Sequence, residues 1–194
     1  MPIEVNVDER LRAIADATFA VAARQGVDAI SYRTVARELG SSTTAITNYL
    51  PTRAALLRNA LDRTLSRWQR DMVAAVATAP PGEHLRTLAI WSCTTEPQDL
   101  ILRHMFIQAL AEVSGAADVL ENFTTDAMTH RQALLDAALD DCLPNPEQLV
   151  DAVFLLCRGF YLSTVESRDT WSDDRAARAI DALLQVTSAL PASP

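Results

Sequence analysis

The feature that most constrains this chain is the recurrence of apolar residues at helical spacing, interrupted by strong helix stops. Between Asn6 and Gly26, apolar residues recur three and four positions apart, as on one face of an α-helix. Alternation of Val, Ile and Thr with polar residues at period two, which would indicate strands, is missing throughout. Glycine is scarce, with five residues among 194. The sequence therefore predicts an all-α protein, and its hydrophobic content of 49% is sufficient for a buried core.

Capping residues and helix stops divide the first eighty residues into four predicted helices. Each is preceded by a side chain that can accept a hydrogen bond from a helix N-terminus: Asn6, Ser31, Ser42 and Thr52. The predicted helices end at Gly26, at Leu39 before Gly40, at Tyr49 before Leu50-Pro51, and at Ala79 before Pro80-Pro81-Gly82. Three short helices thus precede one long helix.

Five further helices are predicted in the rest of the chain, which makes about nine in total. Three of them cover roughly residues 83–94, 97–113 and 117–141. Asn145 is expected to cap the next one, with Pro146 at its first helical position, and this helix is expected to reach about Arg168. Ser172 opens the last helix.

Charge is unevenly distributed along the chain. The net charge of −8, averaged over the whole chain, argues against nucleic-acid binding. Residues 1–70, however, contain ten arginines and seven acids (+3), whereas residues 71–194 contain seven arginines and eighteen acids (−11). The two parts are therefore expected to face different partners. The chain has no lysine, so every positive contact comes from arginine, which can hold a phosphate with two parallel hydrogen bonds.

The sequence predicts a cytoplasmic protein with no membrane partner. Its first nine residues have neither the basic start nor the apolar core of a signal peptide. The stretch from Leu149 to Leu162 is interrupted by Asp151 and Arg158 and is shorter than the ~20 residues that a bilayer requires. An odd number of widely spaced cysteines suits reduced thiols that serve in packing. These cysteines are Cys93, Cys142 and Cys157.

Residues 32–51 have the pattern of a helix-turn-helix motif. Four positions that such a motif buries are apolar or aromatic: Val35, Leu39, Ile46 and Tyr49. Ala36 provides the small side chain needed where two helices cross steeply, and Gly40 tolerates the positive φ that the turn requires. Ser41 departs from the pattern, because that turn position usually carries a small apolar residue.

Hydroxyl side chains gather at the amino end of the second helix of this motif, at Ser42, Thr43, Thr44 and Thr47. That end enters the major groove of DNA, where side chains must be short and able to hydrogen-bond. Asn48 can in addition read adenine through two hydrogen bonds. The alternative is that these hydroxyls only cap and solvate a surface helix. The complete motif favours DNA binding over that alternative.

The motif extends on both sides through Ile14, Ala17, Gly26, the run from Ser31 to Gly40, Ile46, and the run from Leu50 to Leu57. This longer pattern resembles the TetR family of bacterial transcriptional regulators. The resemblance implies an N-terminal three-helix DNA-binding domain, here residues 1–52. It also implies a following helical domain for ligand binding and dimerisation, here residues 53–194.

The resemblance also implies roles for individual residues. Arg33 would contact a DNA phosphate, Tyr49 a backbone or sugar group, and Arg53, with the start of the fourth helix, the DNA backbone. Thr47 departs from the family, which most often has tyrosine there, and Thr44 stands where glycine is frequent, so its side chain is an additional candidate for reading bases. Three further arginines are interpreted as a solvated helix face: Arg37, Arg58 and Arg63. The predicted DNA-binding residues are Arg33, Ser42, Thr43, Thr44, Thr47, Asn48, Tyr49 and Arg53.

A homodimer on a palindromic operator is expected, because a two-turn recognition helix touches only a few base pairs and two copies must act on paired half-sites. The apolar stripes of the last two helices predict the dimer interface, as the resemblance also implies, and Gly159 permits close helix approach there. Arg158 departs from the family, which often has an acid before this glycine.

A small-molecule effector is implied by the resemblance, because family members bind an apolar or amphipathic molecule that releases them from the operator. The chain would then be a regulator, by family default a repressor. The predicted ligand-binding residues are Trp68, Met72, Trp91, Met105, Phe106, Phe123, Phe154, Cys157 and Tyr161. His104, Gln108 and Cys93 are candidate polar points among them.

An enzyme is one competing interpretation. The three histidines are scattered, no His or Cys pair has metal-ligand spacing, and no glycine-rich phosphate loop or nucleophile elbow occurs. No catalysis, no cofactor and no metal ion are therefore expected. The pairs Asp140-Asp141 and Asp173-Asp174 are interpreted as solvated charge at helix ends, because adjacent helical residues point apart.

The second competitor is a helical small-molecule sensor that acts through a protein partner without sequence-specific DNA binding. The acidic segment 71–194 and the missing aromatic residue at Thr47 leave room for it. Selection of a DNA sequence by the protein discriminates between the two interpretations.

Overall fold

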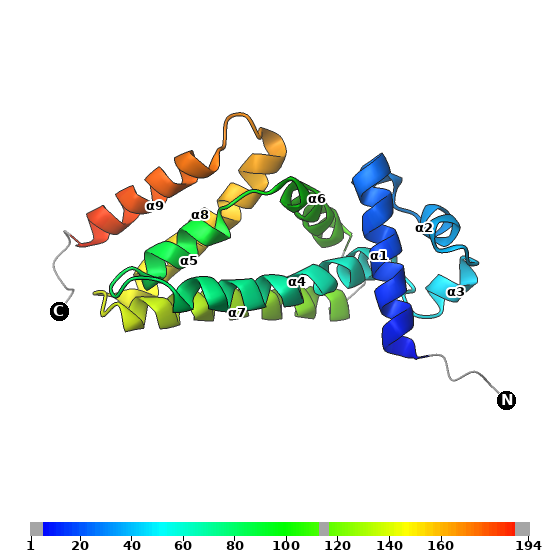
Figure 1. The fold of residues 1–194 in the computed structure, drawn as a ribbon, viewed down its shortest axis with the longest axis horizontal. Coiled ribbons are helices and arrows are strands. Elements are labelled where there is room, and N and C mark those ends of the chain that lie inside the picture. Colours follow the sequence, from blue (N-terminus) through cyan, green and yellow to red (C-terminus); the bar gives the residue numbers. More distant parts are fainter. Residues whose placement is uncertain (1–5, 113–116, 189–194) are drawn as a thin grey trace. The chain divides into compact units, whose positions relative to one another are not determined.

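The computed structural model describes residues 6–112 and 117–188. These ranges contain nine α-helices, one 3-10 turn and no strand (Figure 1). The helices are α1 (Val7–Gln25), α2 (Tyr32–Leu39), α3 (Thr44–Thr47), α4 (Arg53–Ala77), α5 (His84–Ser92), α6 (Pro97–Ala111), α7 (Ala117–Asp140), α8 (Pro146–Glu166) and α9 (Asp173–Ser188), with the turn η1 (Val27–Ala29) after α1. The all-α prediction is confirmed. The predicted end of the sixth helix at residue 113 and the outermost residues of the predicted domains, 1–5 and 189–194, lie outside the described residues.

The residues predicted to cap the first four helices hydrogen-bond as expected. Asn6 accepts from two backbone N–H groups in the first turn of α1, at 3.1 and 3.3 Å. Ser31 accepts from the third residue of α2 at 3.2 Å. Ser42 and Thr52 each accept from the N–H three residues further on, at 3.2 and 3.0 Å. These bonds satisfy N–H groups that the helices leave without a backbone partner, so the helix starts follow from the local sequence.

Asn145 does not cap α8, so that prediction is wrong. Its φ of 49° and ψ of 51° lie in the left-handed region, and its side chain makes no cap hydrogen bond. A capping side chain usually requires extended backbone, which carries the oxygen over the first turn. Pro146 begins the helix instead, since its fixed φ suits the first position and it has no N–H to satisfy. The helix ends at Glu166, before the predicted Arg168.

The first compact unit comprises Met1–Trp68 and Pro97–Asn122, and therefore contains α1 to α3, η1, α6 and the first parts of α4 and α7. α1 packs against α2, η1 and α6. Its fully buried core includes Ile14, Val21, Ile30, Val35 and Ile46, none of which is more than 1% exposed. This core fixes α2 and α3 beside α1, as Figure 1 shows at the blue and cyan end of the chain.

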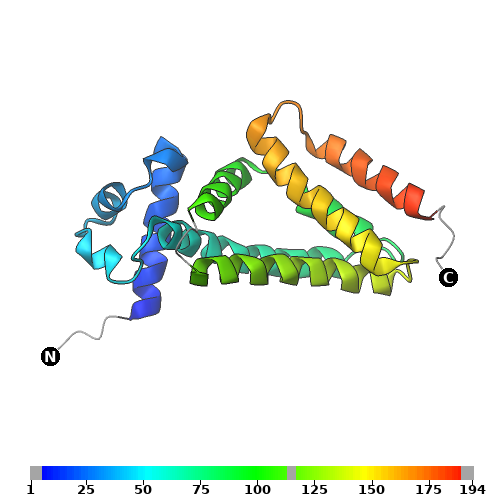
Figure 2. The ribbon, with the colours of Figure 1, turned by 180° about the vertical axis from the view of Figure 1, so that it is seen from behind.

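The second unit comprises Gln69–Glu96 and Phe123–Pro194, with α5, α8, α9 and parts of α4 and α7. α9 packs against both α5 and α8, and α8 and α9 are seen side by side in Figure 2. Arg86 on α5 donates two hydrogen bonds to Asp181 on α9, at 2.7 and 3.1 Å. Leu85, Leu88 and Ile180 contribute to the buried core between these helices.

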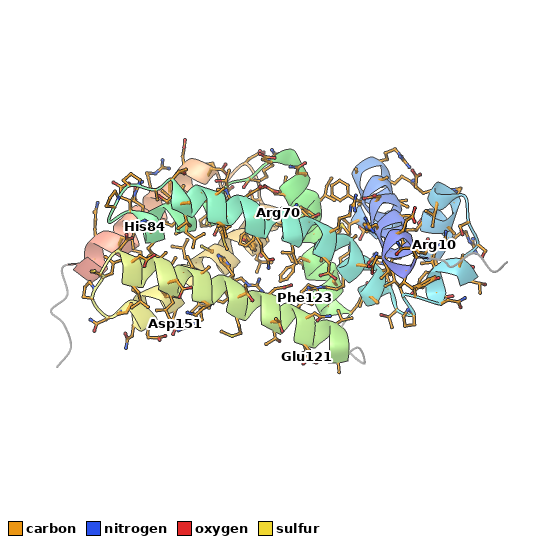
Figure 3. The ribbon with its side chains drawn as sticks, turned by 60° about the horizontal axis from the view of Figure 1, so that its bottom comes forward. Arg10, Arg70, His84, Glu121, Phe123 and Asp151 are labelled. Carbon is orange, nitrogen blue, oxygen red and sulfur yellow. The ribbon has the colours of Figure 1, made fainter. Side chains whose placement is uncertain are left out.

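Asp141, just after α7, caps α5 across 57 and 56 residues of sequence. Its side chain is 1% exposed and accepts from the backbone N–H of His84 at 3.1 Å and of Leu85 at 2.9 Å. Burial raises the pKa of this carboxyl, but the hydrogen bonds from Leu85 and His84 outweigh burial and hold the pKa below its usual value. The prediction of solvated charge is therefore wrong for Asp141, because its partners are distant in sequence. Figure 3 labels His84 at this site.

α8 is the one helix within the described ranges that is long and apolar enough to cross a membrane, judged by length and composition alone. The sequence, by contrast, predicts no membrane-spanning helix. About a third of the relevant stretch is buried, and α8 packs on α5 and α9. Leu155 and Leu162 on this helix are 68% and 51% exposed. α8 thus has one face in the core of the second unit and one apolar face outside it.

Candidate nucleic-acid interface

The predicted helix-turn-helix is formed by α2 and α3. Gly40 ends α2 with φ 62° and ψ 36°, the left-handed conformation that glycine adopts without steric cost. The N–H of Ser41 then donates to the carbonyl of Ala36 at 2.9 Å, which closes the turn. Ala36 is 4% exposed, as expected for the small residue at a helix crossing. The Tyr32 hydroxyl donates to the Leu50 carbonyl at 2.9 Å and joins the two ends of the motif.

Ser41 has a partner that explains why a polar residue stands in the turn. Arg10 on α1, labelled in Figure 3, donates from Nη2 to the Ser41 hydroxyl at 2.7 Å. Val35 and Ile46 have no exposed surface and hold the same region from inside. The turn before α3 is therefore fixed by a polar bond from α1 as well as by apolar packing. No local sequence pattern predicts this bond, because it joins residues 31 positions apart.

The predicted base-reading side chains lie on the outside of the motif. Ser42, Thr43, Thr44 and Asn48 are exposed, whereas Thr47 is half-buried. The hydroxyl of Ser42 accepts from the N–H of Ala45 on α3 at 3.2 Å, and the hydroxyl of Thr47 donates to the carbonyl of Thr44 at 3.4 Å. Within the described ranges, no hydrogen bond engages the side chains of Thr43, Thr44 or Asn48. These three polar groups are available to another molecule.

α3 is shorter than predicted: it covers Thr44–Thr47, whereas the predicted helix runs from Thr43 to Tyr49. Thr43 and Asn48 on either side still have helical φ and ψ. The N–H groups of Tyr49 and Leu50 both donate to the Ile46 carbonyl, which tightens the last turn ahead of Pro51. Tyr49 is half-buried and follows the side chains that face outward.

The two arginines of α2 differ from neighbouring arginines in that no acidic side chain among the described residues pairs with them. Arg33 and Arg37 are exposed, and no carboxylate of the described ranges lies within ion-pair distance of either. Three neighbouring arginines pair with acids: Arg24 with Glu38, Arg58 with Asp62 and Arg63 with Asp16. The solvated-face prediction is wrong for Arg58, which is 7% exposed because it packs in the first unit. Arg33 and Arg37, four residues apart on one helix, form an uncompensated positive pair.

Arg53 is held by the protein itself. Its Nε donates to the Ile30 carbonyl at 2.9 Å, and its Nη2 donates to the Val27 carbonyl at 3.2 Å and to Oε1 of Gln108 at 2.7 Å. It also pairs with Glu112. The guanidinium thus joins the start of α4 to η1 and α6. Its predicted contact with the DNA backbone stays a prediction, and its donors already have partners in the first unit.

Solved structures share this arrangement of helices. A TetR transcription regulator from Haloarcula marismortui is 18% identical, with a TM-score of 0.76, and the match covers 92% of this chain and 98% of that one. The chain has a TetR-like fold. A transcriptional regulator from Rhodococcus sp. Rha1 is 20% identical over 93% of this chain and 99% of that one, with a TM-score of 0.71. A protein from Saccharomonospora viridis in complex with choline is 17% identical over 92% and 96%, with a TM-score of 0.74. No model of a protein family matches the sequence, and no curated protein does.

The TetR-like fold of this chain divides the predicted ligand-binding residues between its units. Trp68, Met105 and Phe106 belong to the first unit, and the other six belong to the second. Four of the nine are buried and the remaining five are half-buried. The buried ones are Met72, Met105, Phe123 and Cys157. That these residues bind a ligand stays a prediction.

The second unit of the TetR-like fold holds a buried polar cluster. The Ser92 hydroxyl donates to the Leu88 carbonyl at 2.8 Å, so its oxygen accepts from Nε2 of His130 at 3.0 Å. Burial first, and then the charge of Arg158, lowers the pKa of His130 to about 4. This histidine is therefore neutral near pH 7. Arg158, which departs from the family pattern, lies with its guanidinium 5.7 Å from the centroid of the Phe154 ring.

The cysteines are free thiols. Cys93 and Cys157 are buried with their sulfurs 3.7 Å apart, as the packing role predicts. Cys142 is exposed with φ 53°, so the packing prediction is wrong for it. No group of three or more metal-ligating side chains occurs among the residues that the structure describes.

A small cavity in the second unit does not include the predicted ligand-binding residues. It measures about 160 Å³ and is lined in part by Leu85, Arg86, Asp141 and Leu149. Pockets for drug-sized ligands usually begin at about 300 Å³. This cavity is therefore too small for the effector that the sequence predicts.

Proposed function

We propose that this chain is a dimeric, DNA-binding transcriptional repressor that a small molecule releases from a palindromic operator. Residues 1–52 act as the DNA-binding domain, and residues 53–194 act in ligand binding and dimerisation. One observation carries the proposal: the polar side chains on the outside of the helix-turn-helix have no protein partner in the described ranges, at Arg33, Arg37, Thr43, Thr44 and Asn48. Arginines on the first helix suit phosphate oxygens, and short polar groups on the second suit base edges.

A homodimer through α8 and α9 completes the proposal. Leu155 and Leu162 on α8 and Val186 on α9 are more than half exposed, with Val186 at 62%. Large apolar side chains on adjacent helices support an association surface. Two copies related by a two-fold axis would present two α3 helices to paired half-sites, which explains why the operator is expected to be palindromic.

The first experiment is selection of binding sequences from random duplex DNA by the purified protein at low salt. We expect enrichment of a palindrome. About three phosphate contacts per protomer predict that the logarithm of affinity falls with the logarithm of salt concentration at a slope near −5. If no sequence is enriched, the proposal fails, and the sensor that acts through a protein partner becomes the better account.

The effector is proposed to be apolar or amphipathic, because most of the predicted ligand-binding side chains are aromatic, methionine or cysteine. The choline complex of the Saccharomonospora viridis protein supports a small-molecule ligand in this fold. Mass spectrometry of molecules that copurify would identify candidates. A candidate that shifts the protein from 1:99 to 99:1 between its two states must favour the released state by ~5.5 kcal/mol. A copurifying molecule that leaves operator affinity unchanged would contradict release, but not DNA binding.

A further inference from the structure

The chemistry of α3 limits which bases it can read. From Ser41 to Thr52 the chain contains no charged side chain. The commonest specific contact in the major groove is Arg or Lys to O6 and N7 of guanine, and this stretch has no such donor. Carboxylates that accept from cytosine are missing from it as well. Recognition of G·C pairs by this segment is therefore disfavoured.

Asn48 and Thr44 lie one helical turn apart and are both exposed. Side chains four residues apart share a face of a helix. Neither side chain is engaged by a hydrogen bond within the described ranges. The Asn48 amide can accept from N6 and donate to N7 of adenine, which is the bidentate pairing typical of asparagine.

The threonines add an apolar component to this face. The Thr47 hydroxyl donates its hydrogen to the Thr44 carbonyl at 3.4 Å, so this half-buried side chain has a methyl group and an acceptor oxygen, but no donor, for an outside contact. Thr44 offers both a methyl group and an unengaged hydroxyl. The C5-methyl group of thymine is the apolar feature of the major groove, and threonine methyl groups contact it.

We propose that α3 reads A·T pairs in each half-site, with Asn48 bonded to an adenine and the methyl groups of Thr44 and Thr47 against thymine methyls. This inference rests on the proposed DNA-binding function and names the chemistry of its partner. Arg33 and Arg37 on α2 contact phosphates, since the first helix of such a motif crosses the backbone. They set affinity and leave the choice of base to α3.

The experiment begins with the palindrome selected by the wild-type protein. In one half-site, each adenine is replaced in turn by 7-deazaadenine, which lacks N7, and each thymine by deoxyuridine, which lacks the methyl group. Affinity is measured by fluorescence anisotropy for the wild type, Asn48→Ala, Thr44→Ser and Arg33→Ala. Thermal unfolding of each variant confirms that it is folded, which is expected because the substituted side chains are exposed.

We expect one 7-deazaadenine position to weaken wild-type binding, by at most the roughly 5- to 150-fold of a full bidentate base contact, because N7 is one of the two atoms that Asn48 would bond. Asn48→Ala should lose a larger factor on normal DNA, because it removes the contact from both half-sites of the dimer, and should lose nothing more at that position. One deoxyuridine position should weaken wild-type binding about 4-fold, the value of one buried methyl group, and should leave Thr44→Ser unaffected. Arg33→Ala is the matched control, because it should weaken binding on all these duplexes by one common factor.

Two results would overturn the inference. A selected palindrome whose two half-sites are enriched only in G·C pairs rejects the inference and leaves the proposed function intact. So does an Asn48→Ala variant that remains as sensitive to every 7-deazaadenine as the wild type. An absence of any selected sequence rejects the proposed function itself, and the inference with it.

Discussion

The polar side chains of α2 and α3 differ from those of the second unit in whether the protein itself engages them. In the second unit, Asp141 caps α5, and Arg131 on α7 bonds to Glu147 at 2.6 Å and to Asp151 at 2.7 Å. On α2 and α3, by contrast, Arg33 and Asn48 have no partner in the described ranges. A polar group that loses its hydrogen bonds to water on folding stabilises the fold only if protein partners replace those bonds. Engaged groups therefore report on stability, and unengaged exposed groups are available for binding.

The first unit contains both kinds of group close together in sequence. Arg10 is engaged with Ser41 and Arg53 with the carbonyls of Val27 and Ile30, whereas Arg33 and Arg37 are not engaged. Residue type does not separate these arginines, since all four are basic residues of the same positively charged segment. Substitutions in the two classes should therefore have separable effects on the free energy of unfolding and on DNA affinity.

The largest expected effect is the pH dependence of stability that His130 imposes. Its pKa in the fold is about 4, lowered by burial and then by Arg158, against an unfolded value of ~6.5. Below pH ~6.5 the unfolded chain binds a proton that the folded chain does not. This contribution is therefore fully present above pH ~6.5 and is lost as the pH falls towards 4, by roughly 3 kcal/mol in all.

Urea unfolding at pH 7.5 and at pH 4.5 measures this loss for the wild type and for His130→Asn. Carboxylates titrate in the same range in both proteins, so the difference between the two pH dependences isolates His130. His104→Gln is the control, because His104 is exposed. If the stability of His130→Asn depends on pH as strongly as that of the wild type, protonation of His130 is not the cause of the pH dependence.

Arg53→Ala should give the next largest effect, a loss of about 2 kcal/mol in the free energy of unfolding, because four bonds of a charged donor disappear and two carbonyls lose a partner. Chemical denaturation measures it. Arg24→Ala is the matched control, since its exposed pair with Glu38 is worth at most about 1 kcal/mol. An Arg53→Ala protein as stable as the wild type, with weaker DNA binding, would return Arg53 to the phosphate role that the sequence predicts.

The sequence predicted those parts of the fold whose causes are local. Capping by Asn6, Ser31 and Ser42 depends on atoms within three residues, and each of these caps is present. The left-handed turn at Gly40 also follows from one residue type and its neighbours. The existence of these helices and of the helix-turn-helix therefore follows from the local sequence.

The sequence did not predict the engagements that join distant segments. The bonds of Arg53 reach residues 23, 26 and 55 positions away, and Asp141 caps a helix 57 positions away. No periodicity or spacing rule identifies such pairings, which is why the sequence alone predicts a DNA contact for Arg53 and solvated charge for Asp141. Whether a polar residue is engaged is a property of the tertiary structure. For that reason the sequence identifies the candidate residues of the site, but it does not show which of them stabilise the fold and which are available to bind DNA.

Gly40→Ala should cost about 1 to 2 kcal/mol, because an L-residue with φ near 62° is strained. A Cβ at this position would meet no atom within 4 Å, so the cost is backbone strain and not a clash. Gly40→Asn is the matched variant, since asparagine tolerates the left-handed region better, and it should lose less. Equal losses in both variants, measured by urea unfolding, would indicate that the turn depends on something other than φ.

The smallest effect on stability is expected for Arg33→Ala. This variant also tests most directly the difference between polar side chains with and without a protein partner. Because Arg33 is exposed and unengaged, the free energy of unfolding should change by no more than about 0.5 kcal/mol. Operator affinity should nevertheless fall, and the slope of log affinity against log salt should become shallower by about 2, since a dimer loses two phosphate contacts. Arg37→Ala tests the second member of the pair in the same way. A stability loss as large as that of Arg53→Ala, or an affinity loss with an unchanged salt slope, would show that lack of a protein partner does not identify the DNA-binding arginines of this fold.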